Sequence, residues 1–420
     1  MNANRRDFIK MAGLASASWA LPKAVSAATT APHVLVIGGG FGGATVAKYL
    51  KLWGGNIDVT LIDRDASHYA CILSNLVVTG ALPMSRIQLG YTNLQTKRGV
   101  NFAQGEALSV DPVAKEVTVK IGNDYFAYSY DKLVLAPGIE FINPAGNYNA
   151  SLTPHAWKAG PQTLLLKNQL SAMTKGQTFV MTIPKSPYRC PPGPYERACS
   201  VADYLKRKKS GAKIIVLDAN ASIQAEPVNF GNAFSKTYKG VLTYIPNAAV
   251  VSVDSSAKSI VTSQGTFKSA VLNVIPNQRA GQIVTNAGLV NDPTGKWALV
   301  NPLSYASTLY PDIHILGDSQ GTGQPKSGHM ANSQAKVCAN AIIRAFNGEA
   351  PDPSPVTSSA CFSPITSTTA AWLTASFQYD PATKAMKRVE ASFAEAAQPT
   401  SDGMQQMFHW ADNIFADSFG

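Results

Sequence analysis

Charged side chains are scarce in this sequence, since Asp, Glu, Lys and Arg together make up only 15% of its 420 residues, against roughly 25% in an average globular protein. Such a composition predicts a surface that is partly covered by a partner. The net charge is +10, but no basic run is interleaved with aromatic residues, so the sequence gives no indication of nucleic-acid binding.

Long apolar runs and metal motifs are also missing. No segment has the roughly 18 uninterrupted apolar residues that a membrane-spanning helix needs, so we expect no transmembrane segment. The sequence contains neither C-x-x-C nor C-x-x-C-H and no close cluster of His and Cys, which argues against structural zinc and against a haem attached to this chain, and we expect no metal site. The five cysteines are an odd number, so at least one thiol has a role other than pairing within the chain.

Residues 4–10, NRRDFIK, form a twin-arginine pattern that precedes a short apolar stretch and the small residues 25–28. This order is typical of an export signal. Because the twin-arginine route carries folded proteins, it suits a protein whose cofactor is inserted before export. The sequence therefore predicts a leader over residues 1–28 and a periplasmic mature protein.

A glycine-rich loop follows the first predicted strand, residues 33–37, and opens a helix that is predicted to end at Trp53. The loop places Gly38, Gly40 and Gly43 in the spacing G-x-G-x-x-G, and Asp63 ends the next predicted strand. Glycines let backbone N–H groups approach a pyrophosphate, and the carboxylate can accept a hydrogen bond from a ribose hydroxyl. The pattern indicates dinucleotide binding.

Two later segments identify the dinucleotide. Residues 133–138, LVLAPG, and 313–318, IHILGD, resemble the two return loops of flavoproteins with two dinucleotide-binding domains. The resemblance implies FAD in the first site, with Pro137 and Gly138 in one loop and Asp318 against the ribityl chain.

A second glycine-rich loop is absent. The predicted strand 178–183 runs into residues 184–194, PKSPYRCPPGP, where prolines supply no N–H group and the single glycine cannot form a phosphate cradle. We therefore expect no NAD(P)H site.

Together these patterns predict an α/β protein with two Rossmann-like three-layer domains, an FAD domain and a degenerate NAD-like domain, and a C-terminal α+β interface domain. The predicted segments are the leader 1–28, the two parts of the FAD domain 31–154 and 278–350, the NAD-like domain 155–277, and the interface domain 351–420.

Four segments carry a closer resemblance: residues 154–160 (PHAWKAG), 189–198 (RCPPGPYERA), 276–281 (PNQRAG) and 325–328 (PKSG). They resemble the flavoprotein subunit of flavocytochrome c sulfide dehydrogenase, and the similarity extends over nearly the whole mature chain. Departures lie at Cys199, at Cys338 and around residues 225–248. A long, unusual string such as RCPPGPYERA makes the resemblance specific.

The resemblance implies roles for further residues. Cys71, in the stretch 68–75 that ends with Asn75, would carry FAD through a thioether, while Cys190 and Cys361 would form a redox-active disulfide. A buried free cysteine and a structural disulfide are the alternatives. Glu196, in the first turn of a predicted helix, is a candidate proton acceptor or only a carboxylate that stabilises the helix dipole. The remaining predicted cofactor-binding residues are Asn75, Lys326, Ser327, Gly328 and Trp410.

The sequence thus predicts oxidation of hydrosulfide, with electrons passed to a c-type cytochrome on another chain. Lys326 and a helix N-terminus near Asn332 would stabilise reduced flavin. One alternative is an enzyme like sulfide:quinone oxidoreductase, which needs a C-terminal helix that lies on the membrane. The apolar residues between Met404 and Phe415 could form such a helix. We favour the interpretation that they pack in the core, with Trp410 over the site. The other alternative is a non-catalytic flavin-binding protein that delivers sulfur.

Overall fold

The first domain is organised around a parallel sheet in the computed structural model, which describes residues 23–25 and 31–420. Its three inner strands are aliphatic runs that are buried on both faces, as is typical of parallel strands, whereas the strand at one edge, residues 101–104, is partly exposed. The spatial order of the strands is β21 (Ile313–Ile315), β10 (Lys132–Leu135), β2 (His33–Ile37), β3 (Asp58–Asp63) and β6 (Asn101–Gln104). Strand β2 and the acidic end of β3 lie where the sequence predicts them.

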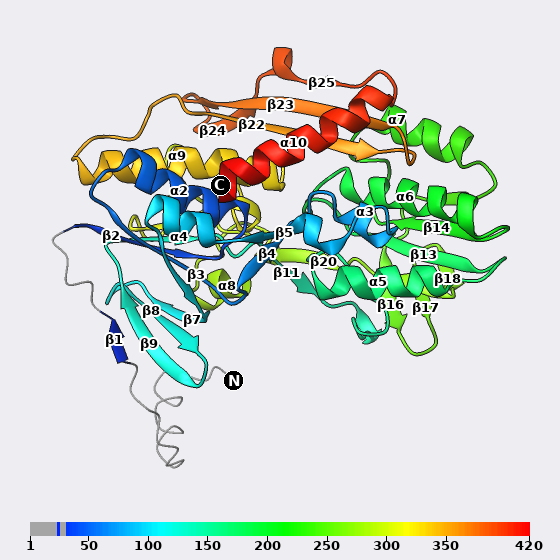
Figure 1. The fold of residues 1–420 in the computed structure, drawn as a ribbon, viewed down its shortest axis with the longest axis horizontal. Helices are drawn as coiled ribbons and strands as arrows, with labels where there is room; N and C mark the ends of the chain where they lie inside the picture. The colour runs from blue at the N-terminus through cyan, green and yellow to red at the C-terminus, as the bar shows by residue number, and fades with distance from the viewer. Residues whose placement is uncertain (1–22, 26–30) are drawn as a thin grey trace.

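Two long helices pack on each other above this sheet, α2 (Phe41–Trp53) and α9 (Gly328–Phe346), as Figure 1 shows. The expectation that α9 begins near Asn332 is wrong, because the helix starts four residues earlier, at Gly328. Ser327 caps it, accepting a hydrogen bond from the Met330 N–H at 3.1 Å. A glycine in the first turn disfavours a helix and conceals this start in the sequence.

An antiparallel meander lies below the sheet in Figure 1, in the order β1-β9-β8-β7. Its strands are β7 (Glu106–Asp111), β8 (Glu116–Ile121), β9 (Asp124–Ser129) and β1 (Lys23–Val25). Strand β1 pairs in parallel with β9. Apart from these three residues, the predicted leader, residues 1–28, lies outside the described residues.

The second domain contains another parallel sheet, drawn in green in Figure 1. Its spatial order is β15 (Leu242–Ile245), β14 (Lys213–Asp218), β13 (Thr178–Ile183) and β19 (Val271–Asn273), with helices α5 (Pro161–Ala172) and α6 (Gly193–Lys208) beside it. A second small sheet joins β12 (Ala145–Asn147), β16 (Val250–Asp254), β17 (Ser259–Thr262) and β18 (Gly265–Lys268). The chain enters through β11 (Ile139–Ile142) and returns through β20 (Asn277–Ala280), which pair antiparallel.

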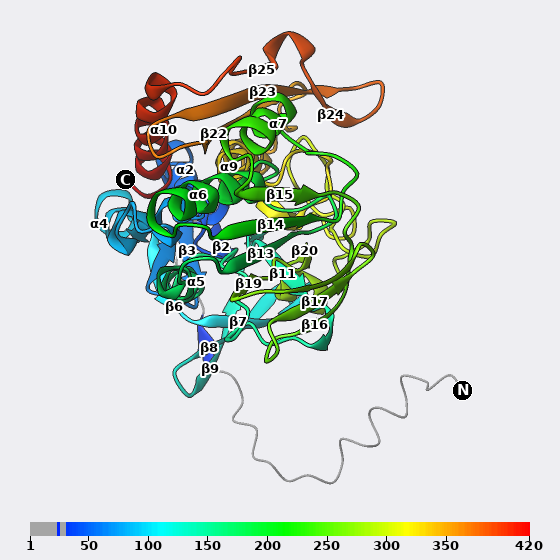
Figure 2. The same ribbon diagram turned by 90° about the vertical axis from the view of Figure 1, so that its right-hand side faces the viewer.

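A C-terminal antiparallel sheet extends over both domains, as Figures 1 and 2 show. It consists of β22 (Val356–Pro364), β23 (Ala370–Asp380), β24 (Ala385–Arg388) and β25 (Ala394–Glu395), and is followed by helix α10 (Ser401–Phe419). Helix α10 packs on α2, β22 and β23. Its apolar residues Met407, Ala411, Ile414, Phe415 and Phe419 are buried.

Shorter elements complete the chain: β4 (Ser67–Tyr69), α3 (Ser74–Val78), η1 (Met84–Ile87), β5 (Gln88–Gly90), α4 (Thr92–Arg98), α7 (Pro227–Asn232), η2 (Ala233–Thr237), α8 (Gln282–Asn286), η3 (Gly317–Ser319) and η4 (Glu390–Ser392). The predicted α/β class, with two parallel-sheet domains and a C-terminal α+β part, is confirmed. Within the described residues no helix combines the length and hydropathy that crossing a bilayer requires.

Candidate active site

The glycine-rich loop has the backbone that its sequence demands. Gly38 adopts φ +99°, and a Cβ added there would lie 2.5 Å from the carbonyl oxygen of Ala136. A Cβ at Gly43 would overlap the carbonyl oxygen of Gly38. Gly40 is the N-cap of α2. Backbone N–H groups at the helix N-terminus are therefore left accessible, as binding of a pyrophosphate requires.

Asp63 ends β3 next to this loop. One of its carboxylate oxygens accepts a hydrogen bond from the Gly39 N–H at 2.5 Å, and the other accepts from the Asp65 N–H at 2.9 Å. Burial raises the pKa of Asp63 above its ordinary value. The carboxylate lines a cavity of about 280 Å³, here called the outer cavity. Its other predicted cofactor-binding residues are Gly38, Gly40, Pro137 and Gly138.

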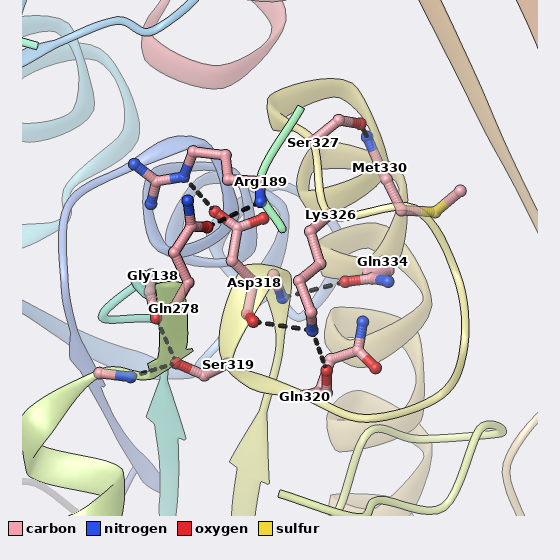
Figure 3. A network of polar contacts seen from close by, with 12 residues as sticks. Gly138, Arg189, Gln278, Asp318, Ser319, Gln320, Lys326, Ser327, Met330 and Gln334 are labelled. Carbon is pink, nitrogen blue, oxygen red and sulfur yellow. Dashed lines mark hydrogen bonds and ion pairs between the residues drawn. The ribbon is translucent and has the colours of Figure 1, made fainter. Parts of the chain in front are cut away.

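A second cavity of about 70 Å³, the inner cavity, adjoins Gly40 and contains Asp318, Ser327, Gly328 and Cys71 in its lining. Arg189 Nε donates to Asp318 Oδ2 at 2.6 Å (Figure 3). Asp318 Oδ1 is buried and has no hydrogen-bond partner in the described residues. A buried oxygen without a partner is rare in proteins, so it fits a carboxylate that accepts a hydrogen bond from a bound hydroxyl group.

Lys326 supports the turn that carries Asp318. Its Nζ donates to the backbone carbonyl oxygens of Asp318, at 2.9 Å, and Gln320, at 2.6 Å (Figure 3). The ammonium also lies 3.7 Å from the centroid of the Trp297 ring, and burial lowers its pKa to about 8. Lys326 lines none of the three cavities described here, so direct contact with a flavin stays a prediction for this residue.

A third cavity of about 40 Å³, here called the sulfur cavity, brings together the residues that carry the predicted chemistry. Its lining includes Cys71, Cys190, Cys361, Glu196 and Trp410. Cys71 also lines the inner cavity, and it therefore lies between the two. All five cysteines are free thiols in this structure. Cys199 and Cys338 are completely buried in helices α6 and α9.

Cys190 and Cys361 reach the sulfur cavity from different domains. Cys190 has a left-handed backbone, φ +58°, and its N–H donates to the Lys326 carbonyl at 2.6 Å. Cys361 lies on β22 opposite Leu373 of β23. Burial raises the pKa of both thiols, that of Cys361 to about 12. A thiolate at either position therefore needs a nearby group that takes up or supplies a proton.

Glu196 is such a group. It lies in the first turn of α6, and burial raises its pKa to about 7, although a hydrogen bond to the side chain of Asn75 acts in the opposite direction. Arg197 Nε donates a hydrogen bond to Asn75 Oδ1 at 2.9 Å, and Asn75 Nδ2 donates to the Gly193 carbonyl at 3.2 Å. These two bonds fix the side chain of Asn75. Asn75 lines no cavity described here and orients Glu196, so its predicted contact with the cofactor remains untested.

His329 and Trp410 form one wall of the sulfur cavity. His329 belongs to the first turn of α9. Its Nδ1 accepts hydrogen bonds from the Ala360 N–H at 2.9 Å and from Trp410 Nε1 at 3.2 Å. These bonds tie α10 and β22 to the N-terminus of α9.

In the second domain, the acidic residue that could bind the ribose of a pyridine nucleotide already has hydrogen-bond partners within the chain. Asp218, at the end of β14, is completely buried. Its Oδ2 accepts hydrogen bonds from the hydroxyls of Tyr195, at 2.7 Å, and Tyr244, at 2.8 Å, and its Oδ1 accepts from Asn220. The carboxylate has no accessible oxygen for a ribose.

Three further residues of the site were not predicted from the sequence. Arg189 lines both the outer and the inner cavity. His68 lines the same two cavities, and its Nε2 is buried with no partner in the described part of the chain. Glu226 is buried and accepts a hydrogen bond from Ser363, two residues beyond Cys361 on β22. Only the position of Arg189, directly before Cys190, offered a signal in the sequence.

The comparisons with known proteins agree with this geometry. Residues 163–276 match the family model "Sulfide dehydrogenase [flavocytochrome c] flavoprotein chain, central". A flavoprotein chain of that name from Chlorobaculum thiosulfatiphilum is 48% identical over 45 residues, which are 11% of this chain and 94% of that sequence. The chain belongs to this sulfide dehydrogenase flavoprotein family.

Other matches place the family member among flavin-dependent oxidoreductases. Residues 32–159 match the model "Pyridine nucleotide-disulphide oxidoreductase". Sulfide-quinone reductase of Aquifex aeolicus is 24% identical over 339 residues, 74% of this chain and 76% of the relative. The crystal structure of the A. aeolicus sulfide:quinone oxidoreductase has a TM-score of 0.77 at 19% identity and covers 93% of this chain and 92% of that one. Two further relatives are matched over only 23% and 29% of their own length.

The chain is thus an FAD-type flavoprotein in fold and family. FAD fits the described residues: the accessible N-terminus of α2, the carboxylate of Asp63 and the unpartnered Asp318 Oδ1 supply the contacts that its pyrophosphate and hydroxyl groups need. Within the described residues no three His, Cys, Asp or Glu side chains gather where a metal ion could be held.

Proposed function

We propose that this flavoprotein oxidises hydrosulfide through a redox-active Cys190–Cys361 disulfide and an FAD linked by a thioether to Cys71, and that it passes the electrons to a c-type cytochrome. The observation that carries the proposal is the sulfur cavity, where three thiols from separate parts of the chain meet beside Glu196. The inner cavity with Asp318 adjoins it through Cys71.

Bound FAD would supply the two-electron acceptor that can release electrons singly. The chain itself performs the sulfur chemistry. The hydrosulfide sulfur attacks one sulfur of the disulfide, so that the S–S bond between Cys190 and Cys361 breaks, a persulfide S–S bond forms and the other cysteine leaves as a thiolate.

Glu196 accepts the proton that hydrosulfide brings into the cavity. A general base is most effective when its pKa lies near the working pH, and the pKa of Glu196 is raised to about 7 by burial. The alternative role, a carboxylate that only stabilises the N-terminus of α6, does not require a place in the cavity lining.

Reducing equivalents do not come from NAD(P)H in this proposal. The loop between β13 and α6 carries Pro191 and Pro192 and is held on the first domain by the Cys190–Lys326 backbone hydrogen bond. The Asp218 carboxylate is already engaged by Tyr195 and Tyr244. Both features support the loss of the nucleotide site.

The acceptor is a haem on a separate chain, because this sequence has no haem-attachment motif. The apolar residues of α10 pack inward on α2, β22 and β23, which gives little support to a helix that lies on a membrane to meet a quinone. The similarity to the Aquifex sulfide-quinone reductase keeps the quinone reaction as the second candidate. The twin-arginine pattern at residues 4–10 supports a periplasmic location.

The test measures anaerobic reduction by hydrosulfide and the following transfer to cytochrome c or to a water-soluble quinone, per bound flavin. The Cys190→Ser and Cys361→Ser variants should keep their flavin and lose sulfide-dependent transfer. Cys199→Ser, which changes a buried thiol outside the cavity, is the matched control. If both cavity variants kept the wild-type turnover per flavin, the disulfide relay would be excluded. If the wild type passed electrons to the quinone and not to cytochrome c, the second candidate would be established. If sulfide never reduced the flavin, a non-catalytic sulfur-delivery protein would be favoured.

A further inference from the structure

Glu226 is a buried carboxyl group that the proposed mechanism does not use. It precedes α7 as its N-cap and has a left-handed backbone, φ +49°. Its side chain is 1% exposed. Burial of a charged carboxylate without a cation costs several kcal/mol, so a buried glutamate at this position needs an explanation in terms of its neighbours.

A hydrogen bond connects Glu226 to the strand that carries Cys361. Ser363 Oγ donates to Glu226 Oε1 at 2.6 Å. Side chains alternate along a strand, so Cys361 and Ser363 point to the same face of β22, and both are buried. Glu226 therefore lies on the face of β22 from which Cys361 reaches the sulfur cavity.

A row of paired residues crosses the C-terminal sheet from Cys361 toward the surface. Cys361 is opposite Leu373 in the β22–β23 pair, and Leu373 is opposite Glu395 in the β23–β25 pair. Two strand spacings of about 4.8 Å place Glu395 roughly 10 Å from Cys361. Glu395 is half-buried. Asn229 of α7 donates to the carbonyl of the neighbouring Ala396 at 2.7 Å, which holds the loop of Glu226 against β25.

The second oxygen of Glu226 has no partner. Oε2 is buried and forms no hydrogen bond within the described residues. The ionisable groups that face Glu226 are Glu196 and Cys199 of α6, Cys361 of β22 and Glu395 of β25. Each is neutral or negative, and burial, together with the two carboxylates, raises the pKa of Glu226 to about 8. The protonated form is thus the stable form at neutral pH.

We propose that Glu226 is a proton-relay residue of the sulfur site, which holds a proton behind Cys361 and passes protons from Glu196 in the cavity to Glu395 at the surface. The inference rests on the proposed function, because hydrosulfide oxidation is the source of the protons. Glu226 acts through Glu196 and Cys361 and does not touch the substrate, so it is a positioning residue.

The electrons and protons of the proposed relay balance. Oxidation of HS⁻ to the level of sulfane sulfur releases two electrons and one proton; the electrons leave by the flavin and its acceptor, and the proton is first bound by the Glu196 carboxylate. Glu226 then takes up one proton from the cavity side and releases its own proton toward Glu395 and solvent. Glu196 becomes free to accept a proton in the next turnover.

The experiment compares the holoenzyme with its Glu226→Gln, Glu395→Gln and Ser363→Ala variants, with Glu116→Gln, at the exposed start of β8, as the control. Stopped-flow reduction by hydrosulfide is recorded between pH 6 and pH 9.5. We expect Glu226→Gln to lower the reduction rate at pH 7 at least about tenfold, as for loss of a proton-transfer group, and to remove the limb of the pH profile near pH 8. Ser363→Ala should move that limb to higher pH, because it removes a hydrogen bond that favours the ionised form.

A second measurement does not depend on sulfide. Infrared difference spectra of the dithionite-reduced and oxidised proteins should contain a protonated-carboxyl band in the wild type that Glu226→Gln lacks. Absence of that band in the wild type, or a Glu226→Gln profile equal to that of Glu116→Gln, would overturn the relay. If Glu226→Gln fails to fold, an unchanged limb in Ser363→Ala has the same consequence. Failure of sulfide to reduce the wild type while the band is present would instead refute the proposed function.

Discussion

Replacement of Glu226 by glutamine should change how the stability of the protein depends on pH. The carboxyl group has an ordinary pKa of 4.5, and in the folded protein its pKa is raised to about 8. Below pH 4.5 the group is protonated in both states. Between these two values the unfolded chain loses the proton and the folded chain keeps it, so the wild type loses stability as the pH rises through this window.

The size of the effect follows from the two pKa values. One pKa unit corresponds to about 1.4 kcal/mol, so the wild type should lose about 4 kcal/mol of unfolding free energy between pH 5 and pH 8 through this group. The glutamine of the Glu226→Gln variant does not titrate, and its amide oxygen can still accept the hydrogen bond that Ser363 donates to Glu226 Oε1 in the wild type. The stability of the variant relative to the wild type should therefore increase by this amount from pH 5 to pH 8.

Urea denaturation of the holoenzyme at pH 5, 6, 7 and 8, followed by circular dichroism, measures this difference. Glu116→Gln on β8, an exposed position, is the control and should run parallel to the wild type. If the Glu226→Gln variant also ran parallel to the wild type over this range, Glu226 would ionise as readily in the folded protein as in the unfolded chain, and the argument from its burial would be refuted.

Three further changes test other parts of the structure. In Cys71→Ser, acid precipitation should leave the flavin in the supernatant, whereas the wild-type pellet should stay yellow; free flavin from the wild type would contradict the thioether. Gly43→Ala should lose most of its bound flavin, measured by the ratio of visible to ultraviolet absorbance, because the new Cβ overlaps the Gly38 carbonyl oxygen; full flavin content would show that the loop can adapt. Tyr195→Phe removes a donor from the buried Asp218 carboxylate and should cost ~1–3 kcal/mol in thermal unfolding without weakening flavin binding; an unchanged melting temperature would contradict the assigned hydrogen bond.

The first domain could be predicted in detail because its signals are local. Strand β2 follows an aliphatic run after His33, Gly38 and Gly43 each meet a steric demand of the turn, and Asp63 ends the next strand. The start of α9 could not be predicted, since the Ser327 cap competes with an unfavourable glycine at the first helical position.

The environment of the sulfur cavity could be predicted only in part. The resemblance selected Cys190 and Cys361, and Glu196 was selected by its place in the first turn of a predicted helix. The structure places all three in one lining. Glu226 gave no signal, because its link to Ser363 joins residues 137 positions apart and arises only when the residue that precedes α7 meets β22. Arg189 pairs with Asp318 for a similar reason: the sequence identifies each charge and does not say which one it meets.

The neighbouring strands β10 and β21 set an order of events during synthesis. Leu133 is paired with Ile313, and the entire second domain is made between them. On the ribosome, the phosphate loop therefore exists well before the turn with Asp318, and the second domain has to fold inside a first domain that still lacks β21, the strand at one edge of its sheet. A cofactor that needs both loops can be held only by a nearly finished chain, which is the situation in which assembly inside the cell has to precede any transport of the protein.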